Sequence, residues 1–276
     1  MRTDRQRGSV VISVDVTTDS PPLLAEIPRL LDLFDRLSLS ATWALDDAAG
    51  VELARQIAVR TAGHELALLV GPDALDDDAS RGEVARYVVA RQEQLAEADL
   101  TATTLAGEQS AAWLERDVDL LAKHGIETVR FGASCNDSAM IKRRLPAVLG
   151  VCDWLWAGAA PMVHPQNVRY GVWSLPGSMS MPAAVPHTRL AADVARVGRS
   201  VETAAADGGV FHLVVHLERL LVRNTQGEMS LVSVLKRISH ARAEGRLDVG
   251  TASQVTQQWA RPSRTTVPAR SILRAA

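Results

Sequence analysis

The chain has 276 residues, a length suited to one large α/β domain, and its 47% hydrophobic content is typical of a globular protein. Its 30 basic and 32 acidic residues leave a formal charge of −2, which excludes a strongly basic nucleic-acid-binding protein. Two cysteines, Cys135 and Cys152, are too few for a disulfide scaffold, so we expect buried, reduced thiols.

Short β-branched runs alternate with longer helical patterns. The first half predicts strand 9–15, helix 28–37, strand 41–45, helix 51–61, strand 64–70, helix 81–98, strand 100–106, helix 111–124 and strand 126–131. The second half predicts strands 153–157 and 171–175, helix 190–205, strand 209–216, helix 230–243, strand 247–250 and a last helix that ends at Trp259. This alternation predicts parallel strands joined by right-handed crossovers.

No internal linker or repeat interrupts the pattern, so we expect a single α/β domain, a distorted parallel barrel, over residues 9–260. Residues 1–8 form an N-terminal extension in this prediction, and residues 261–276 form a basic, flexible tail. The tail holds four arginines and no acid, so a weak contact with an anionic partner is the alternative to a solvated tail. The chain shows neither a signal-peptide core nor an apolar run of membrane-spanning length, which favours a cytoplasmic location.

Two polar residues stand at the ends of predicted strands that are far apart in sequence. Asp15 ends the first strand, and His216 ends the late strand in VFHLVVH. Because catalytic groups gather at the carboxyl ends of parallel strands, these two side chains are candidates for one barrel mouth, as base and acid. His212 lies four residues before His216 on the same strand face, where we expect it inside the barrel as a packed core group.

The stretch from about Ser9 to Trp259 resembles the polysaccharide deacetylase family, also called NodB-homology or carbohydrate esterase 4. SVVISVDVT is similar to the family strand that ends in T-F-D-D-G, GHELALL to the strand that ends in G-H-E-I-G-N-H, and GGVFHLVVH to the strand with the L-x-H motif. The segments IPRLLDLFDRLSLSATWAL and SLVSVLKRISHARAEGRLDVGTASQV resemble the family's second and closing units. The resemblance implies an incomplete (β/α)7-type barrel and zinc-dependent hydrolysis of acetyl groups, in which the metal polarises the carbonyl and activates water.

The resemblance also implies roles for particular positions. The family's catalytic base falls on Asp15 and its acid on His216, but its metal ligands fall on Val16, Leu69 and Asp73. Aliphatic side chains have no lone pair for a metal, and a catalytic zinc site needs three protein ligands. We therefore expect no zinc and no other cofactor, as in a pseudoenzyme.

The arginine that orients the base in the family falls near Thr104 or Leu105, so the resemblance implies that this group is missing as well. The acidic run at 76–78 has two interpretations: a solvated loop, or a loose site for a hard cation. His64 and Trp43 are expected in structural, packed positions.

Trp154 and Trp156 alternate at strand period and share a face. Core packing is one interpretation. A platform on which a sugar ring stacks is the other, because aromatic rings suit the apolar faces of sugars.

Three hypotheses for function follow. The first is a carbohydrate-related binding or regulatory module without metal-dependent hydrolysis. The second is an active deacetylase or other hydrolase that uses Asp15 and His216 with an unrecognised or absent metal. The third is a structural partner of an active homologue. A carbohydrate is the expected ligand, and the sequence indicates no particular protein partner.

Overall fold

The computed structural model describes residues 7–17, 21–46, 50–71, 74–75, 78–107, 112–131, 159–181, 190–221 and 225–260. Four predicted features lie outside these residues: the strand 153–157, both cysteines, most of the N-terminal extension and the basic tail.

The described strands are β1 (Gly8–Val16), β2 (Thr42–Leu45), β3 (Glu65–Val70), β4 (Thr104–Gly107), β5 (Thr128–Phe131), β6 (Gln166–Arg169), β7 (Val172–Ser174), β8 (Met179–Met181), β9 (Val210–His216) and β10 (Leu247–Gly250). The described helices are α1 (Pro21–Arg36), α2 (Gly50–Ala58), α3 (Arg81–Ala96), α4 (Ala112–Arg116), α5 (Val118–Lys123), α8 (Leu190–Asp207), α9 (Leu217–Leu221), α10 (Thr225–Ala243) and α11 (Ala252–Ala260).

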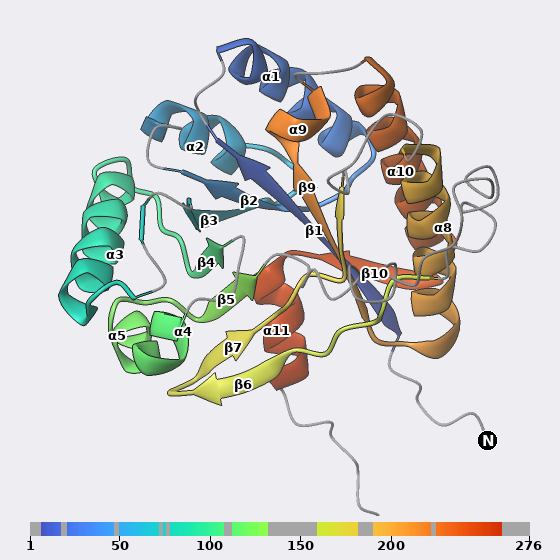
Figure 1. The fold of residues 1–276 in the computed structure, drawn as a ribbon. Helices are drawn as coiled ribbons and strands as arrows, with labels where there is room; N and C mark the ends of the chain where they lie inside the picture. The colour runs from blue at the N-terminus through green and yellow to red at the C-terminus, as the bar shows by residue number, and fades with distance from the viewer. Residues whose placement is uncertain are drawn as a thin grey trace, which may run out of the picture.

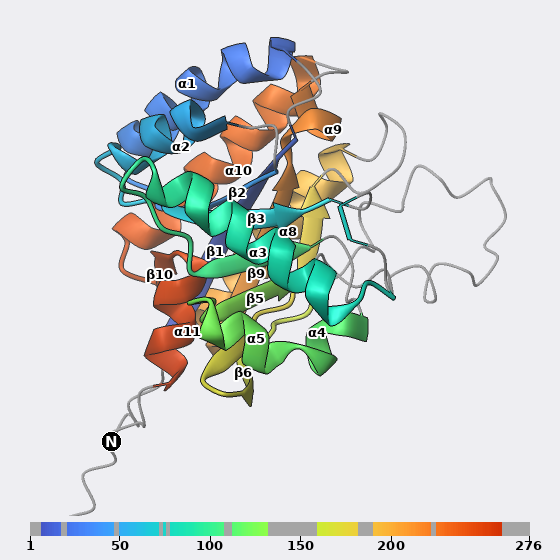
Figure 2. The same cartoon turned by 90° about the vertical axis from the view of Figure 1, so that its left-hand side faces the viewer.

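These strands form one sheet in the order β6-β7-β5-β4-β3-β2-β1-β9-β8, and β10 also pairs with β1. Every pairing is parallel except that of β6 with β7. The sheet curls into a half-barrel with helices α1, α2, α3, α8 and α10 around its outside (Figures 1 and 2). The predicted fold, a single-domain α/β protein with a distorted parallel barrel, is confirmed.

Strand β1 is the centre of the sheet because it is long enough to pair with several strands. Its first half pairs with β10 and its second half with β2, and β9 follows it from Ser9 to Asp15. The strand begins at Gly8, one residue before the predicted start, where the absence of a side chain lets the backbone of α8 approach closely at Ala204.

Three predicted helices differ most from the structure. Helix α10 begins at Thr225 rather than at 230. Helix α1 begins at Pro21 rather than at 28 and keeps Pro28 inside it. Pro28 frees the carbonyl of Leu24, an exposed residue, so water can satisfy that group while Leu23, Ile27 and their neighbours stay buried. The predicted helix 111–124 is divided into α4 and α5 at Asp117, whose buried carboxylate accepts hydrogen bonds from Arg116.

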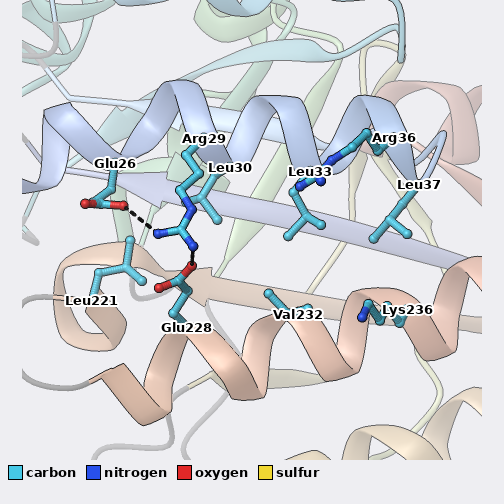
Figure 3. A pocket seen from close by; sticks show the side chains of 10 residues that line it. All are labelled: Glu26, Arg29, Leu30, Leu33, Arg36, Leu37, Leu221, Glu228, Val232 and Lys236. Carbon is cyan, nitrogen blue, oxygen red and sulfur yellow. Dashed lines mark ion pairs between the residues drawn. The ribbon is translucent and has the colours of Figure 1, made fainter.

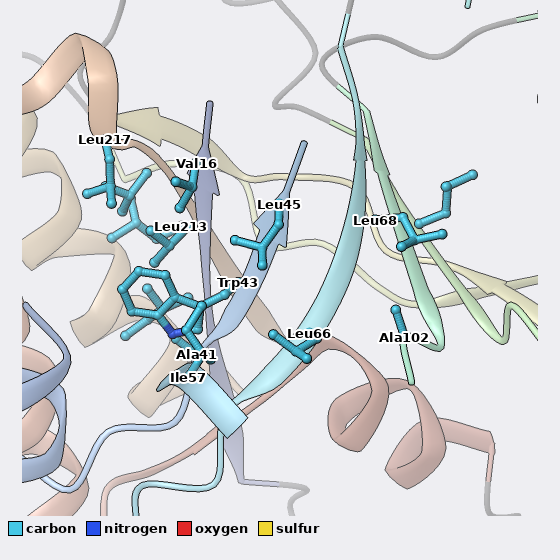
Figure 4. Close-up of a cluster of buried hydrophobic side chains, with 14 of the residues drawn as sticks. Val16, Ala41, Trp43, Leu45, Ile57, Leu66, Leu68, Ala102, Leu213 and Leu217 are labelled. Carbon is cyan, nitrogen blue, oxygen red and sulfur yellow. The ribbon is translucent and has the colours of Figure 1, made fainter. Parts of the chain in front are cut away.

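Strand alternation gives the sheet two different faces. The outer face is apolar: Val16, Trp43 and Leu213 belong to one cluster with Leu217 of helix α9 (Figure 4). The inner face carries small and polar side chains: Ser13, Asp15, Thr42, Thr104, Thr128, Arg130 and His212.

Helix α11 closes one end of the inner face. The backbone N–H of Ala252 donates to Thr42 Oγ1 at 2.8 Å, and the N–H of Ser253 donates to the Glu65 carboxylate at 3.1 Å. Thr104 Oγ1 also donates to that carboxylate. The Glu65 carboxylate thus satisfies one of the free N–H groups at the start of α11, where the helix dipole favours an acidic side chain. None of the described helices is both long enough and apolar enough to cross a membrane.

Candidate functional site

Three charged or titratable side chains meet at the carboxyl ends of β1, β5 and β9. Asp15 Oδ1 accepts a hydrogen bond from Arg130 Nη2 at 2.6 Å, and Asp15 Oδ2 lies 3.3 Å from Arg130 Nη1. The same Oδ2 lies 3.2 Å from His216 Nδ1. Asp15 and His216 are direct partners in the β1–β9 register, so the pairing of these strands fixes their approach. We call Asp15, Arg130 and His216 the mouth cluster.

The mouth cluster is almost withdrawn from solvent. The exposed fraction of the side chain is 0% for Arg130, 4% for Asp15 and 9% for His216. Burial by itself raises the pKa of Asp15, but the positive charge of Arg130 and the contact with His216 lower it, and the net pKa lies below the ordinary value. Asp15 is therefore an anion at neutral pH, neutralised by the guanidinium beside it.

Arg130 corrects a prediction from the sequence. The resemblance implied an arginine near Thr104 or Leu105, and the sequence has none there. In the structure, Thr104 forms a hydrogen bond with Glu65, and Leu105 is buried in the core. The arginine beside Asp15 comes from the next strand, β5, in the segment TVRF. An arginine at an inward position of a short buried strand needs a buried anion as its partner, and that pattern could have revealed the pair.

The structure describes two of the three positions that the resemblance assigns to metal ligands, and both hold buried aliphatic side chains. Val16 points into the apolar layer under the helices, on the face opposite Asp15 (Figure 4). Leu69 packs on the inner face with Ala44, Ala67 and Ala106. Asp73 lies outside the described residues.

Within the described part of the chain, no three His, Cys, Asp or Glu side chains lie close enough together to hold a metal ion. The zinc that the resemblance implies needs three such donors. The donor set of the described residues therefore does not fit a zinc ion.

His212 lies deeper on the inner face, as the sequence predicts. Its Nε2 is 2.8 Å from Ser13 Oγ, and its Nδ1 is 3.0 Å from the carbonyl oxygen of Pro176. Burial and the nearby charge of Arg130 lower the pKa of His212 to about 3, so the ring is neutral at physiological pH. His212 and Ser13 are both buried, and their hydrogen bonds connect the segment before β8 to β1 through His212 of β9.

His64 and Trp43 also have the structural positions expected of them. Trp43 is buried, and its ring packs edge-on against those of Phe34 and His64. His64 Nδ1 accepts a hydrogen bond from the N–H of Ala41, and burial lowers the pKa of His64 to about 4. Trp154 and Trp156, the candidate sugar platform, lie outside the described residues.

A separate groove lies on the outside of the molecule between α1 and α10 (Figure 3). Its volume is about 330 Å³, its floor includes Leu30, Leu33 and Val232, and Arg29 bridges it through an ion pair with Glu228 of 2.9 Å. No residue of the mouth cluster lines it. The groove is a gap between two packed helices and takes no part in the chemistry of the mouth.

Comparisons with solved structures find the same architecture in several other proteins. A mutant of a carbohydrate esterase family 4 pseudoenzyme matches 91% of this chain and 67% of its own, with 12% identity and a TM-score of 0.50. The match to a 4-alpha-glucanotransferase from Thermococcus litoralis covers 92% of this chain and 40% of the glucanotransferase chain, with 12% identity and a TM-score of 0.54. An uncharacterized protein from Agrobacterium tumefaciens matches 91% and 90% of the two chains, with 16% identity and a TM-score of 0.50.

No protein-family model matches the sequence, and no curated protein matches it significantly. At these low identities a structural likeness shows the fold and not the activity. The chain therefore shares a fold with these proteins, among them a carbohydrate esterase family 4 pseudoenzyme.

Proposed function

We propose that this protein is a polysaccharide-deacetylase-like module that binds carbohydrate at the mouth of its half-barrel and does not perform metal-dependent hydrolysis. One observation carries the proposal. Asp15 is held between Arg130 and His216, while the neighbouring ligand positions are occupied by Val16 and Leu69. The fold supports a carbohydrate ligand, because a family 4 pseudoenzyme and a glucanotransferase share it.

The argument against hydrolysis is energetic. A metal contributes several kcal/mol to the transition state by polarising the carbonyl, and each 1.36 kcal/mol is a factor of ten in rate. An acid–base pair alone supplies about 10²–10⁴-fold. A buried aspartate that is already paired with an arginine does not replace the missing metal.

The first experiment tests for metal and turnover together. Protein purified without chelator is submitted to elemental analysis and then assayed on N-acetylated chitin oligomers and on acetylated xylan, with and without added zinc or cobalt. We expect less than a tenth of a zinc per chain and no release of acetate above the buffer blank. Stoichiometric zinc, or metal-dependent acetate release, would refute the proposal.

The second experiment tests binding. Isothermal titration with chitin, xylan and α-glucan oligomers should give saturable heat with at least one of them. Asp15→Asn should weaken that binding, because it removes the negative charge from the mouth cluster. Asp248→Asn is the matched control: Asp248 is exposed and pairs in register with Ser9, at the other end of β1. If no oligomer binds, or if both variants weaken binding equally, the mouth is not the carbohydrate site.

The contact of 3.2 Å between Asp15 and His216 favours one alternative, a hydrolase that needs no metal. Its signature would be acetate release that persists in chelator and disappears in His216→Ala. With the proposed function, wild type and His216→Ala are equally inactive.

A further inference from the structure

The hydrogen bonds around Asp15 determine where a proton sits on His216. An ionised carboxylate only accepts hydrogen bonds. Arg130 donates to both oxygens of Asp15, and His216 Nδ1 approaches Oδ2 at 3.2 Å. For that approach to be favourable, Nδ1 must carry a hydrogen. A neutral imidazole has one N–H and one lone pair, so the lone pair is then on Nε2.

The other nitrogen of the ring, Nε2, is not engaged by Asp15 or Arg130, and no hydrogen bond joins it to another of the described residues. His216 is also the most exposed of the three side chains.

We infer that Asp15 is a positioning residue, and that it holds His216 in the Nδ1–H form so that Nε2 accepts a hydrogen bond from a ligand's hydroxyl or ammonium group. This revises the role of base that the resemblance gives to Asp15, because both of its oxygens are already engaged and Arg130 reduces its basicity. The ligand's identity as a sugar rests on the proposed function. The tautomer does not.

His212 provides an internal reference. Its Nδ1 lies 3.0 Å from the carbonyl oxygen of Pro176, which can only accept, so His212 also carries its hydrogen on Nδ1. Ser13 Oγ then donates to Nε2 of the same ring. His212 thus reports the signal of an Nδ1–H ring whose tautomer is fixed by the backbone and not by Asp15.

The test is long-range ¹H–¹⁵N correlation NMR on protein labelled at its seven histidines. The spectrum is recorded near pH 8, above the ordinary histidine pKa of about 6.5. His216→Asn identifies the His216 signals by their loss. We expect His216 Nδ1 to have a protonated-nitrogen shift and Nε2 a lone-pair shift, as His212 has. A protonated Nε2 on His216 in the wild type would overturn the inference, whatever any variant does.

Asp15→Asn adds a sharper test. The shortest contact of the carboxylate is from Oδ1 to Arg130 at 2.6 Å, so the amide oxygen should take that place and turn the NH₂ group toward His216. An NH₂ group donates, so His216 Nδ1 must accept and the tautomer should reverse, while His212 stays unchanged. If folded Asp15→Asn protein keeps the wild-type tautomer, Asp15 does not position the ring.

Titration with N-acetylchitohexaose separates this inference from the proposed function. If the oligomer binds, the Nε2 resonance of His216 should shift at least twice as far as the Nδ1 resonance. Binding without movement of Nε2 would refute recognition by His216. If neither this oligomer nor the others bind, the carbohydrate function fails, while the tautomer of the free protein still decides the role of Asp15.

Discussion

Arg130 and Asp15 form an ion pair that is almost completely buried, so removing either partner leaves a buried, uncompensated charge. Arg130→Met should lower the free energy of unfolding by about 3–5 kcal/mol, the usual cost of breaking a buried pair. The double variant Arg130→Met with Asp15→Leu should recover most of that loss, because an apolar pair has no charge to desolvate. Urea unfolding near neutral pH measures both. A loss below about 1 kcal/mol in the single variant would show that Asp15 is solvated.

The same pair has a defined pH dependence. The pKa of Asp15 is lowered from its ordinary value of 3.8, so the folded protein holds fewer protons than the unfolded chain in the interval below that value. The stability from the pair is therefore complete above about pH 4 and is lost as the pH falls through the lower folded pKa. The difference between wild type and Arg130→Met should shrink in this acidic interval.

The lowered pKa of His212 also makes the free energy of unfolding fall as the pH falls, but over a higher pH interval than that of Asp15. The pKa of His212 falls from 6.5 to about 3 on folding, so between these values the unfolded chain binds a proton that the folded protein does not. Stability should therefore fall as the pH is lowered from 6.5, with a slope of at most about 1.4 kcal/mol per pH unit from this residue. His212→Gln should flatten the curve measured by urea unfolding.

At the scale of elements, the contact of β1 with α8 depends on Gly8. A Cβ added at Gly8 would lie 1.9 Å from the backbone oxygen of Ala204, so the strand and the helix would have to separate. Gly8→Ala should cost about 1–3 kcal/mol, as overpacking does. Gly82→Ala is the matched control: an added Cβ meets only Ser80 Oγ at 4.0 Å, and alanine favours helix α3 by up to about 1 kcal/mol. Thermal unfolding of both variants should give shifts of opposite sign.

For the whole molecule, the sheet order predicts where exchange of amide hydrogens is slowest. Strand β1 is buried along its length and pairs with β2, β9 and β10, so its amides should exchange only through global unfolding. Strand β6 is at one end of the sheet order and mostly exposed, so it should exchange at least tenfold faster. Hydrogen-exchange mass spectrometry can compare the two. Equal protection would mean that β6 is covered in solution.

The sequence by itself determined the architecture, because each strand and helix carries a local periodic pattern. The predicted strands at 9–15, 209–216 and 247–250 match β1, β9 and β10 within one residue at each end. The ends of strands also identified Asp15 and His216 as neighbours, since parallel pairing brings their carboxyl ends together. The short strands β6 and β8 were missed, because three or four residues carry too little periodicity.

Only the tertiary structure decided the chemistry of the mouth. Arg130 was not recognised from the sequence, because its partner is 115 residues away and no local pattern links them. The direction of Val16 also depends on the sheet, since strand alternation points it at the helices and Asp15 at the interior. Local patterns specify backbone conformation. The charge state and hydrogen bonds of a buried group depend on which distant side chains the folded sheet brings into contact with it, and this holds for Asp15, Arg130 and His216.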